Sequence, residues 1–133
     1  MPTRRSILLI SAAFLTTGHS SVLAAPAGDP IKMFDTDADG TLDLDEVKKA
    51  AAALFARLDR DHDGTLDRRE LAGRLSPREL AAADPDHDGT LSLDEYLAIV
   101  QQRFNAANRD NDGTLDAKEL DTPAGRALLR LLR

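Results

Sequence analysis

Apolar residues recur along this 133-residue chain with a spacing that predicts short helices joined by polar loops. A leucine in the local sequence Gly-Thr-Leu occurs four times, at intervals of 24 or 25 residues: Leu42, Leu66, Leu91 and Leu115. Further apolar residues stand eleven positions before and five positions after each leucine: Ile31, Phe55, Leu80 and Phe104, then Val47, Leu71, Tyr96 and Leu120. We expect these flanking residues to lie on helix faces turned to a common core. The leucines suit short extended segments that pair one loop with another.

The polar segments around these leucines share one twelve-residue pattern. Each has an acidic or amide side chain at positions 1, 3 and 5, glycine at position 6 and glutamate at position 12, which is the EF-hand loop pattern. Loops 1 to 4 are Asp35–Glu46, Asp59–Glu70, Asp84–Glu95 and Asn108–Glu119. One match can arise by chance, whereas four in register indicate a metal-binding protein.

The spacing within each loop follows from the chemistry of a hard cation. Such an ion takes about six to eight oxygen ligands from a chain that curls around it, with glycine at the sharp turn and a bidentate glutamate at the end. Of the 23 acidic residues in the chain, 20 lie within the loops, which is unlike an evenly solvated acidic surface. The predicted ligands, with position 7 acting through its carbonyl, are Asp35, Asp37, Asp39, Thr41, Asp43 and Glu46; Asp59, Asp61, Asp63, Thr65, Asp67 and Glu70; Asp84, Asp86, Asp88, Thr90, Ser92 and Glu95; and Asn108, Asp110, Asp112, Thr114, Asp116 and Glu119.

Only 12 or 13 residues separate one loop from the next, so adjacent hands must share helices. Residues 47–58 and 96–107 predict unbroken helices about 18 Å long, which place the loops they connect at opposite ends. In the middle connector, Ser76, Pro77 and Glu79 form a capping box after the weak point at Gly73, which predicts two short helices. A final helix is expected to begin at Thr122-Pro123.

This arrangement brings loops 2 and 3 together at one end and loops 1 and 4 together at the other. The sequence therefore predicts an all-α fold, a compact EF-hand helical bundle with four metal loops in which adjacent hands share helices.

The first 24 residues have the order of a secretory signal peptide, with Arg4 and Arg5, then a short apolar run, then Val22-Leu23-Ala24 as a cleavage site. The apolar run is shorter than the roughly 20 residues that a membrane anchor needs. We expect cleavage near Ala24, a four-EF-hand domain over residues 25–133 and a periplasmic location. Cleavage leaves 15 Lys and Arg against 23 Asp and Glu, a net charge of −8. Cysteine is absent, so metal is the natural stabiliser of this small domain.

From Ile31 to Arg133 the chain resembles the lanmodulins, periplasmic lanthanide-binding EF-hand proteins of methylotrophic bacteria. The resemblance rests on the close loop spacing, the DGTLD core of three loops, Asn108 and the tail TPAGRALLRLLR. It implies selective binding of lanthanide(III) ions and a metal-driven conformational change. It also implies a role in handling lanthanides in the periplasm, where lanthanide-dependent alcohol dehydrogenases use the metal. Lanmodulin loops typically carry proline at position 2 and favour aspartate at position 9, whereas here only Pro85 matches at position 2 and loop 3 has Ser92.

The charge of the loops bears on the choice of ion. Loops 1 and 2 offer five carboxylates each at ligand positions, and loops 3 and 4 offer four. High ligand charge favours a trivalent ion but does not exclude calcium, the usual ion of this loop. We expect up to four lanthanide sites with loop 4 the weakest, because Asn108 removes a charge, and calcium as the weaker or alternative ligand. A periplasmic calcium buffer or sensor is the alternative function.

Other functions fit the composition less well. A calmodulin-like sensor uses a methionine-rich groove, whereas the chain after residue 24 contains a single methionine, Met33. No enzyme is expected, since His62 and His87 occupy loop position 4 without a nucleophile or partner. The acidic balance disfavours nucleic acid, and no membrane partner is expected. We expect a monomer. A metal-linked dimer is the alternative, in which arginines on the helices of one molecule contact the loop carboxylates of another.

Overall fold

The computed structural model describes residues 28–133, so the predicted signal peptide and its cleavage site lie outside the described residues. In chain order the helices and strands are α1 Pro30–Phe34, β1 Leu42–Asp43, α2 Leu44–Leu58, β2 Thr65–Leu66, α3 Pro77–Ala83, β3 Leu91–Ser92, α4 Leu93–Ala107, β4 Thr114–Leu115, α5 Ala117–Leu120 and α6 Pro123–Leu129. Between residues 28 and 133, no helix has the length and hydropathy needed to cross a membrane.

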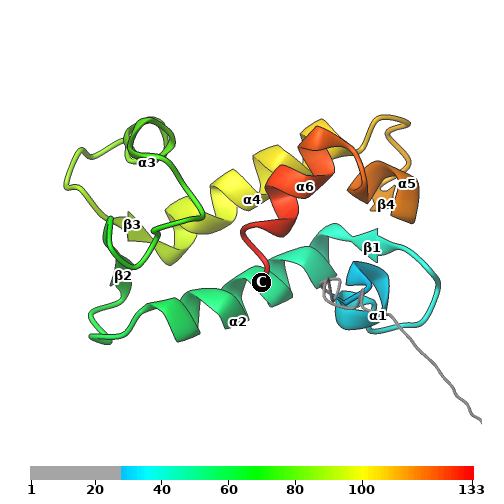
Figure 1. Ribbon diagram of the computed structural model, residues 1–133, viewed down its shortest axis with the longest axis horizontal. Helices are drawn as coiled ribbons and strands as arrows, with labels where there is room; N and C mark the ends of the chain where they lie inside the picture. Colours follow the sequence, from blue (N-terminus) through cyan, green and yellow to red (C-terminus); the bar gives the residue numbers. More distant parts are fainter. Residues whose placement is uncertain (1–27) are drawn as a thin grey trace, which may run out of the picture.

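Two 15-residue helices, α2 and α4, form the centre of the fold and each is shared by two hands (Figure 1). The sequence predicted both helices, and each begins three residues earlier than expected. The reason is a capping box at each start, in which Asp43 or Ser92 accepts a hydrogen bond from the N–H of the glutamate three residues later. The predicted helical bundle with shared helices is confirmed.

The loops pair at the two ends of these helices. Strand β1 pairs antiparallel with β4, and Leu42 lies opposite Leu115. Strand β2 pairs antiparallel with β3, and Leu66 lies opposite Leu91. Loops 1 and 4 therefore meet at the right of Figure 1 and loops 2 and 3 at the left, as the connector lengths predicted.

The core is continuous from one pair of loops to the other. The leucines of the four strands are fully buried, and Phe55 of α2 packs edge-on against Tyr96 of α4 with ring centroids 5.6 Å apart. The Tyr96 hydroxyl donates a hydrogen bond of 2.8 Å to the carbonyl of Leu131, and burial raises the pKa of Tyr96 to about 12. Of the eight predicted flanking residues, seven are buried and Ile31 is half-buried against the core.

The connector between loops 2 and 3 differs in part from the prediction. Only its second half, α3, is a helix, and it starts with the predicted Ser76 capping box. Residues 68–74 form successive turns instead of a helix, because Gly73 adopts a left-handed φ of 83° that interrupts the helical hydrogen bonds. The predicted pair of short helices is therefore wrong for the first half of the connector and confirmed for the second.

The C-terminal segment closes the bundle over α4. Helix α6 begins at Pro123 with Thr122 as its cap, as predicted, but ends at Leu129 rather than continuing to the last residue. Leu131 and Leu132 follow in a turn and are buried, so the expected closure of the core by these leucines is confirmed. Arg103 of α4 donates a hydrogen bond of 2.6 Å to the carbonyl of Ala127 and forms an ion pair with Glu79 of α3.

Candidate metal-binding loops

The four loops have nearly the same backbone conformation. The residue at position 4 has a positive φ in every loop, between 55° and 62°: Ala38, His62, His87 and Asn111. At position 5 the aspartate oxygen Oδ1 accepts hydrogen bonds of 2.9–3.1 Å from both the N–H and the hydroxyl of the position-7 threonine. Because position 4 is exposed, His62 and His87 point away from the core, as the sequence predicted.

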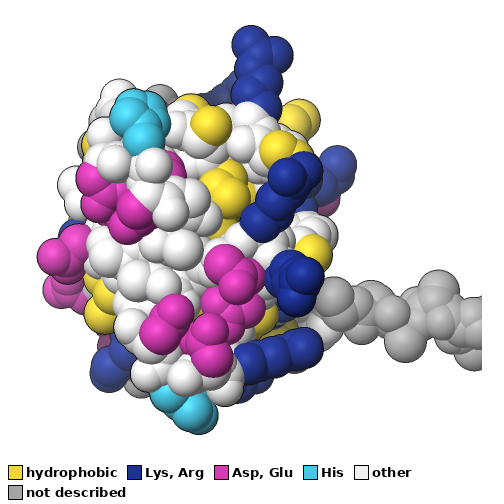
Figure 2. All heavy atoms as spheres, turned by 90° about the vertical axis from the view of Figure 1, so that its left-hand side faces the viewer, with side chains coloured by type: hydrophobic (Ala, Val, Ile, Leu, Met, Phe, Trp, Pro, Cys, Tyr) yellow, Lys and Arg dark blue, Asp and Glu magenta, His cyan; other side chains and the backbone are white. Residues whose placement is uncertain are grey.

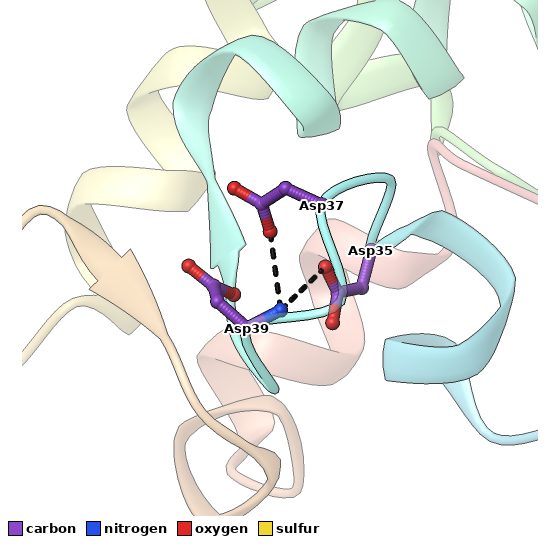
Figure 3. Close-up of side chains that lie close together, drawn as sticks. All are labelled: Asp35, Asp37 and Asp39. Carbon is purple, nitrogen blue, oxygen red and sulfur yellow. Dashed lines mark hydrogen bonds between the residues drawn. The ribbon is translucent and has the colours of Figure 1, made fainter.

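Loop 1 shows how the aspartates gather around a common point. The N–H of Asp39 donates to the carboxylates of Asp35 and Asp37, at 3.3 and 3.2 Å, so that the three side chains surround the curled backbone (Figure 3). Oxygens from these three carboxylates lie within 4.8 Å of one another. Unpaired carboxylates at this separation repel, and a cation between them would relieve the repulsion.

Each of the other loops brings three carboxylates equally close. The sets with oxygens within 4.8 Å are Asp59, Asp61 and Glu70 in loop 2, Asp84, Asp86 and Glu95 in loop 3, and Asp110, Asp112 and Glu119 in loop 4, while loop 1 has a second set of Asp37, Asp43 and Glu46. Loop positions 1, 3 and 12 thus converge in loops 2 and 3, and positions 3, 5 and 12 converge in loop 4. All-oxygen, mostly anionic donor sets of this kind suit hard cations.

The side chains at positions 5 and 9 also make contacts within the protein, and several of them stand outside the close sets. Asp63 and Asp88, at position 5, accept hydrogen bonds from Thr65 and Thr90 and stand outside the close sets. Position 9 caps the helical turn that follows: its side chain accepts the N–H of the position-12 glutamate, at 2.8 Å for Asp43 and 3.2 Å for Ser92. Asp67 and Asp116 make the same contact at 2.9 Å.

The closing glutamate returns the capping contact, which the sequence interpretation did not anticipate. One carboxylate oxygen of Glu46, Glu70, Glu95 and Glu119 accepts the N–H of its position-9 residue, at 2.8–3.0 Å. Positions 9 and 12 are three residues apart, with Asp or Ser followed by Glu, which is the capping-box signature already visible at Ser76. That spacing could have revealed the dual role of the two positions.

Crowding of the carboxylates changes their pKa values. A side-chain hydrogen bond with Asp35 raises the pKa of Asp37, and one with Asp84 raises the pKa of Asp86. Desolvation raises the pKa of Asp61 in the corresponding position. Since a raised pKa means that the proton is retained to higher pH, protons compete with cations at position 3 as the pH falls toward these values.

The closing glutamate of loop 1 shows the opposite effect. Burial of Glu46 by itself raises its pKa, but the N–H groups of Asp43 and Thr36 outweigh burial and leave the pKa below its ordinary value. Glu46 is therefore held as a carboxylate, the form in which it can bind a cation.

Loop 4 differs from the others at its first position. In loops 1, 2 and 3 the glycine N–H at position 6 donates to the position-1 carboxylate, at 2.8, 2.9 and 2.7 Å. Asn108 accepts no corresponding hydrogen bond from the N–H of Gly113. The residue is only 9% exposed, and its oxygen Oδ1 is buried without a hydrogen-bond partner among residues 28–133. A buried, unpaired amide oxygen is unfavourable, and a cation in the loop would satisfy it. The residues of loop 4 thus fit a metal ion, with one charge fewer at this position.

Replacing Asn108 by aspartate is expected to raise the metal affinity of loop 4 by about tenfold, or about 1.4 kcal/mol. The change adds a carboxylate and restores an acceptor for the N–H of Gly113. Titration of single-loop variants, in which the other closing glutamates are changed to glutamine, measures the affinity. Ser92→Asp in loop 3 is the matched control, because it adds a charge without a new acceptor for a glycine. An Asn108→Asp loop no tighter than the original, or an original loop 4 as tight as loop 1, would contradict the argument from charge.

Comparison with known proteins bears on the N-terminal pair of loops. Residues 30–50 and 51–72 match the family model described as EF hand. These two segments contain loops 1 and 2 with the helix that they share. No curated protein matches the chain. The match and the acidic clusters together support an EF-hand metal-binding protein.

The acidic side chains are displayed at the surface where an ion can reach them. Figure 2 looks onto the end that carries loops 2 and 3, and acidic side chains gather there in separate patches, with Lys and Arg along one side. Asp61 and Asp86 are exposed, whereas Asp59 and Asp84 are only 7% and 4% exposed. Each of these two loops is therefore anchored in the core at position 1 and open to solvent at position 3.

Proposed function

We propose that this protein binds trivalent lanthanide ions in the periplasm in preference to calcium, that binding drives its folding, and that it serves lanthanide uptake and handling. The observation that carries the proposal is the concentration of carboxylates at ligand positions, five in each of loops 1 and 2 and four in each of the others. The resemblance to lanmodulins in loop spacing and C-terminal tail supports the same ion.

Electrostatics gives the reason for the preference. At equal distance, a trivalent ion attracts each carboxylate about 1.5 times as strongly as a divalent ion does. Five carboxylates leave a net charge of −3 around a divalent ion and −2 around a trivalent one. The mutual repulsion of the three oxygens that loop 1 holds within 4.8 Å of one another is therefore better neutralised by the trivalent ion.

Calcium is the second candidate, and the EF-hand match over residues 30–72 favours it because calcium is the usual ion of this loop. A periplasmic calcium buffer would need the same four loops and the same closing glutamates. The two functions differ in the ratio of affinities, not in which residues bind.

Calorimetric titration with lanthanum and, separately, with calcium tests the proposal. We expect up to four ions per chain and a dissociation constant for lanthanum at least about 100-fold below that for calcium, which corresponds to about 2.7 kcal/mol per site. The variant with all four closing glutamates changed to glutamine should bind neither ion tightly, since each loop loses its bidentate carboxylate. Equal affinity for the two ions would favour the calcium buffer.

A further inference from the structure

The four loops differ in how firmly they hold the closing glutamate. In loops 1, 2 and 4 the backbone N–H at position 2 donates to a carboxylate oxygen of the position-12 glutamate. The three bonds are Thr36 to Glu46 at 2.7 Å, Arg60 to Glu70 at 2.8 Å and Arg109 to Glu119 at 3.2 Å. The other oxygen of each glutamate accepts the N–H of position 9. Both oxygens that an ion would need are thus already engaged.

Loop 3 lacks one of these bonds because its second residue is Pro85, which has no N–H. Glu95 accepts a bond of 2.8 Å from the N–H of Ser92 on its oxygen Oε1, and within residues 28–133 its oxygen Oε2 accepts none. Pro85 and Glu95 line the same open groove between α3 and α4. The unengaged oxygen is therefore accessible from solvent.

We infer that the residue at position 2 sets how firmly an empty loop holds its closing glutamate, and that Pro85 is a positioning residue that leaves Glu95 free to move onto an ion. This inference rests on the proposed function only in that the loops bind metal, whichever ion that is. An oxygen that accepts an N–H must weaken or redirect that bond to give its lone pair to a cation, and loop 3 is spared this step. Loop 3 consequently binds more tightly than its four carboxylates alone predict.

The effect of Pro85 is expected to be the same for lanthanum and calcium, because the missing N–H acts on the empty loop. Pro85→Ala supplies that N–H and should weaken metal binding at loop 3 by about three- to tenfold for both ions. Tyr96, the only tyrosine in a chain without tryptophan, directly follows Glu95. Because loops 2 and 3 lie at the same end, Glu70 is changed to glutamine in every variant compared, so that terbium luminescence excited through Tyr96 reports on the loop-3 ion. Calcium affinity follows from displacement of terbium.

Pro77→Ala is the matched control, since it makes the same change in chain flexibility at the start of α3, outside the loops. It should leave the terbium midpoint at loop 3 unchanged. Equal shifts in the two variants would overturn the inference and assign the effect of Pro85 to chain stiffness. A shift for one ion only would overturn it as well, since it would make Pro85 a selectivity residue.

A second measurement detects the new bond directly. Loop 3 is emptied by changing Asp86 and Asp88 to alanine, while loops 1, 2 and 4 are loaded with lanthanum, or with calcium if only calcium folds the chain. In this background the new backbone amide that Pro85→Ala creates should exchange its hydrogen about tenfold more slowly than when Glu95 is also changed to alanine. Equal exchange rates would overturn the inference. Failure of the proposed function is distinguishable, because the unmodified protein would then bind lanthanum and calcium with equal affinity, while the difference in exchange rate between these two variants would remain.

Discussion

Removal of metal by a chelator is expected to abolish most of the helical structure of this protein. Twenty acidic residues lie in the four loops, and each loop holds carboxylate oxygens within 4.8 Å of one another. Among residues 28–133 none of these loop carboxylates forms a salt bridge. An ion present at 100 times its dissociation constant stabilises the folded state by about 2.7 kcal/mol, so four such sites contribute about 11 kcal/mol. That is comparable with the whole stability of a typical domain, about 5–15 kcal/mol.

Far-ultraviolet circular dichroism, with and without chelator, measures the change. The helical signal should fall on chelation and return when lanthanum is added in excess of the chelator. The variant with glutamine at all four closing positions is the control, and its signal should not respond to metal. A helix content that stays constant through chelation would refute metal-driven folding and would mean that the leucine-rich core suffices.

Replacement of Gly125 by alanine is expected to destabilise the metal-loaded protein by about 3 kcal/mol or more. Gly125 is buried where α6 crosses α5, and an added Cβ would overlap the carbonyl oxygen of Glu119 and lie 2.5 Å from the Cα of Leu120. These are backbone atoms, so the clash is relieved only by moving one helix. Alanine gains about 1 kcal/mol in helix propensity over glycine, which is smaller than the clash.

The same substitution should weaken loop 4, because the residue that it displaces is the closing glutamate. Thr122 donates its hydroxyl to the carbonyl of Glu119 at 2.6 Å and accepts the N–H of Gly125 at 3.0 Å, which ties α6 to the end of the loop. Thermal unfolding followed by circular dichroism measures the loss of stability. Gly28→Ala serves as control, since its Cβ would meet only the flexible side chain of Met33, at 3.4 Å. An unchanged melting temperature for Gly125→Ala would show that α6 is not held against α5.

The main features of the fold were predictable because the sequence repeats. Loop spacing required shared helices, and shared helices placed loops 2 and 3 at one end and loops 1 and 4 at the other, as the two strand pairs confirm. The cap at Ser76 was also predictable from local sequence. The turns after Glu70 were not, because Gly73 weakens a helix without specifying the conformation that replaces it.

The hydrogen bonds of the candidate sites could not be predicted from the sequence to the same extent. The ligand pattern marks which residues can face an ion, but not what engages them while a loop is empty. That Glu46 and Glu70 accept a backbone N–H from position 2, whereas Glu95 does not, follows from the curl of the loop in three dimensions. The unpaired oxygen of Asn108 is likewise a property of its burial. Pro85 was recognisable in the sequence, but its effect on Glu95 was not.

Direct competition between lanthanum and calcium is the most decisive test of whether this protein selects lanthanides. The chelated protein is placed in a calcium concentration about 1,000 times that of the loops, and lanthanum is then added up to four ions per chain while helix content is followed. We predict that calcium alone produces little helix and that lanthanum restores the folded signal by the time the loops are filled. Full folding in calcium, with no further change on adding lanthanum, would contradict lanthanide selectivity and identify a calcium-binding protein.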